Sequence, residues 1–155
     1  MKKRIIIIIL IVLVVIQFIR PTRNLSATLS PNDITQHYTV PDTVAAILKR
    51  SCNDCHSNNT YYPWYVNMQP VGWWLQHHVN EGKGELNFAE FGTYPAKKQY
   101  HKLQGIVKQV KKDGMPLDSY LWIHTNAKLS AHDKELLINW ANDLGKEIAA
   151  KNGLN

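Results

Sequence analysis

Hydrophobic residues follow two different patterns along this 155-residue chain. Near the N-terminus they form one unbroken aliphatic run, Ile5 to Ile16. From about residue 43 onward they recur at intervals of three and four, the period of a helix with one buried face. Between the two, residues 21–40 lack periodicity and are rich in Ser, Thr, Asn and Pro. We therefore divide the chain into an apolar segment (1–20), a tether (21–40) and a helical domain (41–155).

Four helices are predicted in the domain, and no segment shows the alternation typical of a strand. Their expected ranges are about Thr43–Cys55, Pro70–Gly82, Ala96–Lys112 and Ser130–Ile148. Ser130 and Asp133 form an S-x-x-D capping pattern that predicts the start of the last helix. The buried stripe of the first consists of Val44, Ile47, Leu48, Cys52 and Cys55. The fold class predicted is all-α, with few aliphatic and many aromatic core candidates.

The apolar segment has the features of an export signal. Lys2, Lys3 and Arg4 precede it and Arg20 follows it, and positive residues are retained on the cytoplasmic side. The first pair of small residues after it, Ser26 and Ala27, makes only a weak cleavage site, so an uncleaved anchor is expected. Residues Ile5–Ile19 give about 22 Å of helix against a hydrocarbon core of ~30 Å, a difference that snorkelling basic side chains can bridge. The prediction is a single transmembrane helix in the inner membrane, with the domain in the periplasm.

The net charge of +6 comes mainly from residues around this segment. Five of the eighteen Lys and Arg residues lie before residue 24, whereas all twelve acids follow it, which leaves the rest of the chain at +1. A basic surface for nucleic acid is therefore not expected.

The two cysteines lie in the sequence SCNDCH, with His56 directly after Cys55. Three chemistries use such a pair: covalent haem attachment, half of a zinc site and a redox dithiol. Outside the cytoplasm, reduced dithiols and zinc thiolates are less favoured. Zinc would need two further ligands, and a redox dithiol usually lies in an α/β fold. Cys52, Cys55 and His56 therefore favour one covalently attached haem c, with His56 as the iron ligand.

The ligand on the other side of the iron is predicted to be Met115. Gly114 and Pro116 hold it in a turn between the third and fourth helices, where it is poorly placed merely to fill a gap. The alternative is His78, on the inner face of the second helix, although a hydrogen-bonded core histidine is an ordinary explanation for that residue.

Several segments resemble one family. The stretches IQFIRPTRN, SCNDCHSNNTYYPWY, GMPLDSYLWIH and AKLSAHDKELLINWA resemble the small haem-binding domain family of bacterial envelope proteins. The helix that ends in CxxCH, the GMP turn and the C-terminal helix also resemble the class I cytochrome c fold. This resemblance implies a covalent haem held by Cys52, Cys55 and His56, and suggests Met115.

The function expected is that of a membrane-anchored, single-haem c-type cytochrome. It would transfer one electron between redox partner proteins in or at the membrane, and it would not be an enzyme. Two alternatives stay open: a gas sensor or weak peroxidase with an open distal site, and a haem subunit of a larger envelope complex. In the last case the lysine-rich face of the third helix would dock an acidic partner.

Overall fold

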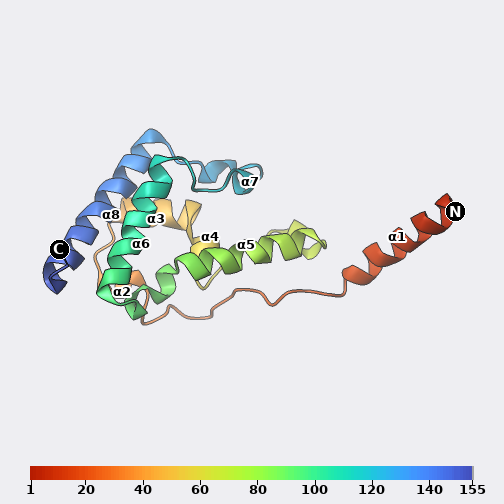
Figure 1. Ribbon diagram of the computed structural model, residues 1–155, viewed down its shortest axis with the longest axis horizontal. Coiled ribbons are helices and arrows are strands. Elements are labelled where there is room, and N and C mark those ends of the chain that lie inside the picture. The colour runs from red at the N-terminus through yellow and green to blue at the C-terminus, as the bar shows by residue number, and fades with distance from the viewer. Residues whose placement is uncertain (155) are drawn as a thin grey trace.

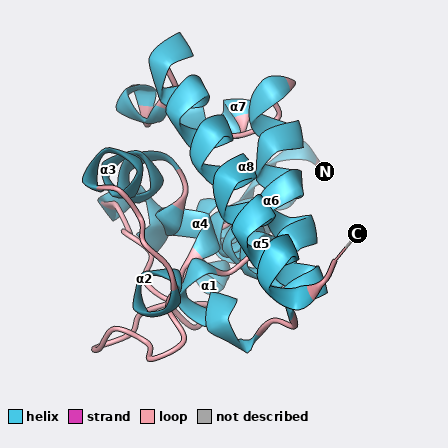
Figure 2. Ribbon diagram, turned by 90° about the vertical axis from the view of Figure 1, so that its left-hand side faces the viewer, coloured by secondary structure: helices cyan, strands magenta, loops and turns pink. Residues whose placement is uncertain are grey.

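The computed structural model describes residues 1–154, and within that range the elements are helices joined by loops (Figure 2). The longer helices are α1 (Lys2–Ile16), α3 (Asp42–Ser51), α5 (Val71–Glu85), α6 (Ala96–Lys111) and α8 (Ala131–Asn152). The short ones are α2 (Ile34–His37), α4 (Asn53–His56), η1 (Trp64–Asn67), η2 (Phe88–Thr93), α7 (Asp118–Leu121) and η3 (Thr125–Ala127). Over the described residues the prediction of an all-α fold is confirmed.

A pair of antiparallel helices, α6 and α8, forms the centre of the domain (Figure 1). Helix α3 packs against α8, and α4 packs against α5. The largest fully buried side chains are Phe91, Leu103, Leu137, Ile148 and Val79. The apolar faces of α3, α6 and α8 follow the helical period and meet between these elements, and burial of apolar area is the main force that holds them together. The face predicted to be buried on the second helix is wrong in part, because Val71 and Trp74 are exposed and only Val79 of that face is fully buried.

Helix α8 begins at the capping box predicted from the sequence. The Ser130 Oγ accepts a hydrogen bond of 3.1 Å from the Asp133 amide, and the Ser130 amide donates one of 2.9 Å to the Asp133 carboxylate. Gly153 ends the helix in the left-handed conformation with φ of 62°. Both ends are therefore fixed by local contacts.

The first predicted helix is not continuous. It divides at Cys52, whose φ of −130° and ψ of −42° lie outside the helical region, so that α3 and α4 point in different directions. The prediction of one helix over residues 43–55 is wrong at this point. Its hydrophobic stripe gave no sign of the break, because the thiols continue the 3–4 spacing through it.

The segment predicted as a tether is partly attached to the domain. Ile34, at the start of α2, is 2% exposed, and α2 packs against η2. The Tyr38 hydroxyl donates a 2.6 Å hydrogen bond to Gln99. Earlier in the segment, the Asn24 side chain donates to the carbonyl oxygen of Ser57 and to the hydroxyl of Thr60. The contacts of Asn24 fix the residues that directly follow the cysteine motif.

The transmembrane helix predicted within residues 1–20 is not found. Helix α1 has 15 residues and ends at Ile16, where the amide of Gln17 turns back to the carbonyl oxygen of Val14. A helix of that length measures about 22 Å, which is shorter than a bilayer core of ~30 Å. Across residues 1–154, every helix falls short of the length and apolar character needed to span a membrane.

Candidate functional site

The cysteine motif occupies a sharp bend between α3 and α4. The amide of Cys52 donates to Leu48 at the end of α3, and the amides of Cys55 and His56 donate to the Cys52 carbonyl oxygen at 3.2 and 3.0 Å. The bend therefore belongs to both helices. It brings Cys52, Cys55 and His56 to one side of the domain, where they line a common hollow.

Two adjoining cavities, of about 660 and 450 Å³, open at this bend. Ser51, Cys52, His56, Glu85 and Met115 line both of them. Ligand pockets usually measure ~300–1,000 Å³, so the space suits a large, mainly apolar group. The structure thus places Met115 beside Cys52 and His56 although some sixty residues separate them in the chain.

His56 is fixed in one tautomer. Its Nδ1 lies 2.9 Å from the carbonyl oxygen of Leu86, so Nδ1 carries the proton and donates it, which leaves the lone pair of Nε2 free. The Phe88 ring packs edge-on against the imidazole at 6.4 Å between centroids. Burial is the main cause that lowers the pKa of His56, so the ring is neutral at pH 7. A neutral imidazole with an oriented free nitrogen is the form that binds a metal.

Both thiols are free and protonated at neutral pH. Burial raises the pKa of Cys52 to about 12 and that of Cys55 to about 11. A redox dithiol works the other way, through a lowered thiol pKa. A zinc site needs ligands besides the thiols, and in the described part of the chain no three His, Cys, Asp or Glu side chains lie together as a metal-binding group.

The two candidates for the second iron ligand line the same cavity of about 660 Å³. Met115 also lines the second cavity, whereas His78 does not. The His78 ring is held by Trp74, edge-on at 4.6 Å between centroids, and by Glu81, whose carboxylate lies 3.5 Å from Nδ1. Because His78 already has these partners and Met115 is shared by both cavities, the structure agrees better with the prediction of Met115. The ligand set itself stays a prediction.

Glycines leave room around the cavities. A Cβ added to Gly84 or Gly105 would have no atom within 4 Å, and these residues line the larger and the smaller cavity respectively. Each costs about 0.5–1 kcal/mol relative to alanine within a helix. Ser51 lines both cavities, but its Oγ is buried away from them and has no hydrogen-bond partner among the described residues. The open volume beside the glycines indicates that a group of some size belongs here.

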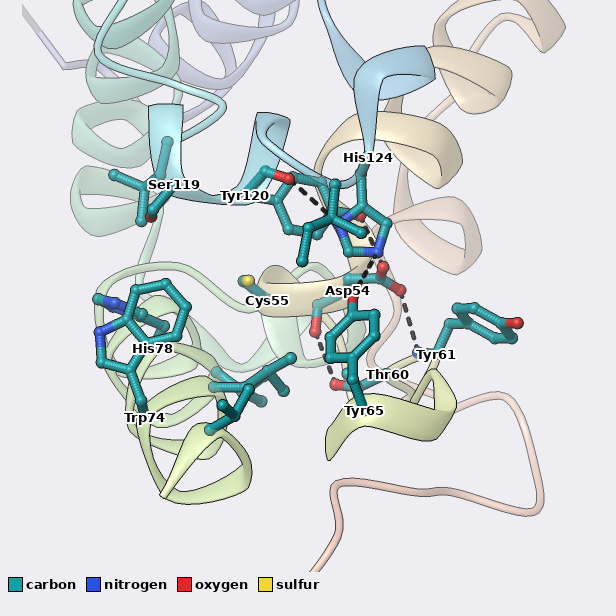
Figure 3. Close-up of a pocket in the computed structure, with 15 residues that line it drawn as sticks. Asp54, Cys55, Thr60, Tyr61, Tyr65, Trp74, His78, Ser119, Tyr120 and His124 are labelled. Atoms are coloured by element: carbon teal, nitrogen blue, oxygen red, sulfur yellow. Dashed lines mark hydrogen bonds between the residues drawn. The ribbon is translucent and has the colours of Figure 1, made fainter. Parts of the chain in front are cut away.

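A polar network fixes the residues between the cysteines, and sequence reasoning missed it. The Tyr120 hydroxyl donates a 2.7 Å hydrogen bond to Asp54, and the Tyr65 hydroxyl donates to the Nε2 of His124 at 3.2 Å (Figure 3). The Tyr120 and His124 rings are stacked, with centroids 4.1 Å apart. Burial, followed by the hydrogen bond and the charge of Asp54, raises the pKa of Tyr120. Only the abundance of aromatics in these segments hinted at such a role.

One comparison with known proteins gives a match. A family model described as a haem-binding domain matches residues 11–143. The chain belongs to this haem-binding domain family. No curated protein and no solved structure matches it.

The residues around the bend fit a haem, the group named in the description of this family. A haem-binding domain needs an iron ligand, an apolar cavity and enough volume for the macrocycle. His56 offers the free Nε2, the two cavities supply the volume, and Leu48, Phe88 and Ile106 are among the apolar residues that line the smaller one. The matched region covers the bend and Met115 as well as most of α8.

Proposed function

We propose that the chain is a c-type cytochrome domain that binds one haem covalently and transfers single electrons. The observation that carries this proposal is the convergence of Cys52, His56 and Met115 on the adjoining cavities, with the Nε2 of His56 unprotonated because Nδ1 donates to Leu86. Haem bound there supplies a one-electron iron couple. The polypeptide binds that group and holds its ligands in place.

Each residue of the motif would have a separate task. The thiols of Cys52 and Cys55 would each add S–H across one vinyl double bond and form a thioether, with no other reactant consumed. The Nε2 of His56 would bind the iron, and the Leu86 carbonyl oxygen would hold the ring in place through Nδ1. Met115 would supply a thioether sulfur, a ligand that raises the reduction potential relative to a second histidine.

A closed iron site favours electron transfer over catalysis. If His56 and Met115 both held the iron, no substrate or gas would reach it, and the chain would make or break no substrate bond. The test is to add carbon monoxide to the reduced protein, for the wild type and for Met115→Ala. We expect no spectral change for the wild type and a change for the variant. Binding of carbon monoxide by the wild type would favour a gas sensor or a weak peroxidase instead.

The location proposed is the outer face of the cytoplasmic membrane, with α1 as the attachment. The support is the basic segment Lys2 to Arg4 before an apolar run, together with side chains in Ile5–Val15 that are each at least 45% exposed. Fractionation of cells that express the full chain should place the haem in the membrane fraction, accessible to protease added to spheroplasts. Haem recovered in the cytoplasmic fraction would contradict this location.

The partners proposed are redox proteins in or at the same membrane. Five exposed lysines of α6 and its C-cap form a basic face that suits an acidic partner: Lys97, Lys98, Lys108, Lys111 and Lys112. Electron transfer that uses this face should slow as ionic strength rises, because at 0.1 M salt largely screens the attraction between exposed charges more than ~10 Å apart. A rate independent of salt would exclude the lysine face as the docking surface.

A further inference from the structure

One end of the haem domain carries large apolar side chains exposed to solvent. Trp64 in η1 is 75% exposed, Trp122 just after α7 is 77% exposed, and Ile123 is 62% exposed. Exposed apolar residues are unremarkable when scattered, but a contiguous group of them marks an interaction surface. We refer to the six exposed residues of this end as the apolar end surface: Trp64, Met68, Val71, Trp74, Trp122 and Ile123.

Four of these residues come together from three segments of the chain, and Met68 and Trp122 adjoin them in the sequence. Val71 and Trp74 of α5 and Ile123 after α7 line one small hollow of about 80 Å³, together with Tyr65 of η1. Trp64 packs edge-on against Tyr65, with centroids 6.0 Å apart. Segments more than fifty residues apart thus present apolar side chains around a single point (Figure 3).

The end of α1 is fastened beside this surface. The Gln17 side chain makes two hydrogen bonds with the backbone of Gln69: its amide donates to the carbonyl oxygen at 3.1 Å, and its oxygen accepts from the N–H at 2.9 Å. The indole of Trp73 donates to the Ile19 carbonyl oxygen at 2.7 Å. The apolar helix α1 therefore leaves the domain at the end where α5 begins (Figure 1).

The occupant that fits both features is a lipid surface. Tryptophan is enriched at the boundary between headgroups and acyl chains, where its ring is buried and its N–H remains hydrated. Arg20 and Arg23 follow the apolar run at the same junction, and arginines there suit anionic headgroups. A protein partner would explain the exposed surface but not its position at the root of an apolar helix.

We propose that the apolar end surface is a second membrane contact, which seats the haem domain on the headgroup boundary beside α1. This inference rests on the membrane attachment proposed above. Asp54, Cys55, His78 and Tyr120 line both the small hollow and the larger haem cavity, so the cavity lies directly behind the surface. The contact would hold the haem close to the membrane. It would also fix the orientation of the domain relative to the bilayer, which attachment through α1 alone would not fix.

The test uses the full, haem-loaded chain in phosphatidylglycerol–phosphatidylcholine vesicles that contain a phospholipid with a photoreactive diazirine in its acyl chain. After illumination, mass spectrometry locates the lipid adducts. We expect adducts on α1 and also on residues 61–74 and 117–124, and none on the exposed face of α6 or α8. Adducts on α1 alone would overturn the second contact but leave membrane attachment intact. Absence of adducts from the whole chain would overturn both.

Paired variants identify the residues responsible. The double variant Trp64→Ser and Trp122→Ser should lower the adduct yield on the domain about tenfold. The loss of ~56 Å² of apolar contact is enough to weaken a binding equilibrium tenfold. The yield on α1 should not change. The matched control changes two residues of the loop before α2 that are also exposed, Leu25→Ser and Leu29→Ser, and should leave both yields unchanged. An unaltered haem spectrum verifies that each variant is folded. Equal loss in both pairs, or protein–protein crosslinks between two such surfaces, would contradict a lipid contact.

Discussion

The contact between α4 and α5 gives the most quantitative prediction. The two helices can approach this closely only because Gly82 has no side chain. Gly82 lies in α5 against the cysteine motif, and a Cβ at this position would lie 2.7 Å from the carbonyl oxygen and 2.9 Å from the Cβ of Cys55. Contacts under 3.0 Å are essentially never seen for a Cβ atom. The substitution Gly82→Ala must therefore push α4 away from α5.

Two opposing effects set the size of the change. Alanine within a helix gains about 1 kcal/mol over glycine. Overpacking a well-filled contact costs about 1–3 kcal/mol, and the upper half of that range applies because the atom displaced is backbone. We expect Gly82→Ala to lower the free energy of unfolding by about 1–2 kcal/mol. The control is Gly84→Ala, two residues further along α5, where no atom lies within 4 Å; it should raise the free energy of unfolding by about 0.5–1 kcal/mol.

The assay is urea unfolding of the haem-free variants, followed by far-ultraviolet circular dichroism, because Gly84 lines the haem cavity and its variant is a clean control only while that cavity is empty. Haem absorbance per polypeptide, compared with the wild type, is a second measurement. Gly82→Ala should also lower the haem content, because the displaced residue is one of the attachment cysteines. If Gly82→Ala were as stable as Gly84→Ala and loaded as well as the wild type, the close approach of α5 to the cysteine motif would be refuted.

Substitutions of three residues in the site and its supports give four further predictions. Tyr120→Phe removes the hydroxyl that donates a 2.7 Å hydrogen bond to Asp54. We expect the free energy of unfolding, measured by urea titration at pH 7, to fall by about 1–3 kcal/mol. A loss below about 0.5 kcal/mol would contradict a structural role for this bond. Folding raises the pKa of Tyr120 above 10.0, so the unfolded chain releases this proton at a lower pH than the folded chain does. The wild type should therefore lose stability above pH 10 more steeply than Tyr120→Phe. Parallel stability profiles for the two proteins would refute this. Met115→Ala should lower the reduction potential measured by potentiometric titration, and an unchanged potential would exclude Met115 as a ligand. Ser130→Ala removes the cap of α8 and should cost about 1 kcal/mol at pH 7. The cap lowers the pKa of Asp133 below 3.8, so the cost should shrink as the pH falls from 3.8 through that lowered pKa, where the folded state also becomes protonated; a cost independent of pH would contradict this coupling.

Local sequence patterns were sufficient for some parts of the structure. The helical period and the capping residues Ser130 and Asp133 predicted the main helices to within a few residues, because such signals act over one or two turns. Spacing alone marked Cys52, Cys55 and His56 as a group, since all three lie within five positions.

Contacts between distant segments were not predictable in the same way. The Asp54–Tyr120 hydrogen bond joins residues 66 positions apart, and nothing in either local pattern specifies the other partner. The break at Cys52 is equally hidden, because both halves have the same apolar spacing. Gly82 resembled a helix end, yet it lies inside α5, where the approach of the cysteine motif requires a residue without a side chain. In each case tertiary packing, not local preference, decides the conformation.

The attachment of haem to the chain is tested most directly by intact mass together with a pyridine haemochrome spectrum, on protein matured in cells that attach haem. We expect a mass equal to that of the polypeptide plus one haem after acid denaturation, with a haemochrome typical of two thioether links. Cys52→Ala with Cys55→Ala should lose the added mass while the helices are retained. A colourless wild-type chain with the mass of the bare polypeptide would contradict covalent haem at this bend.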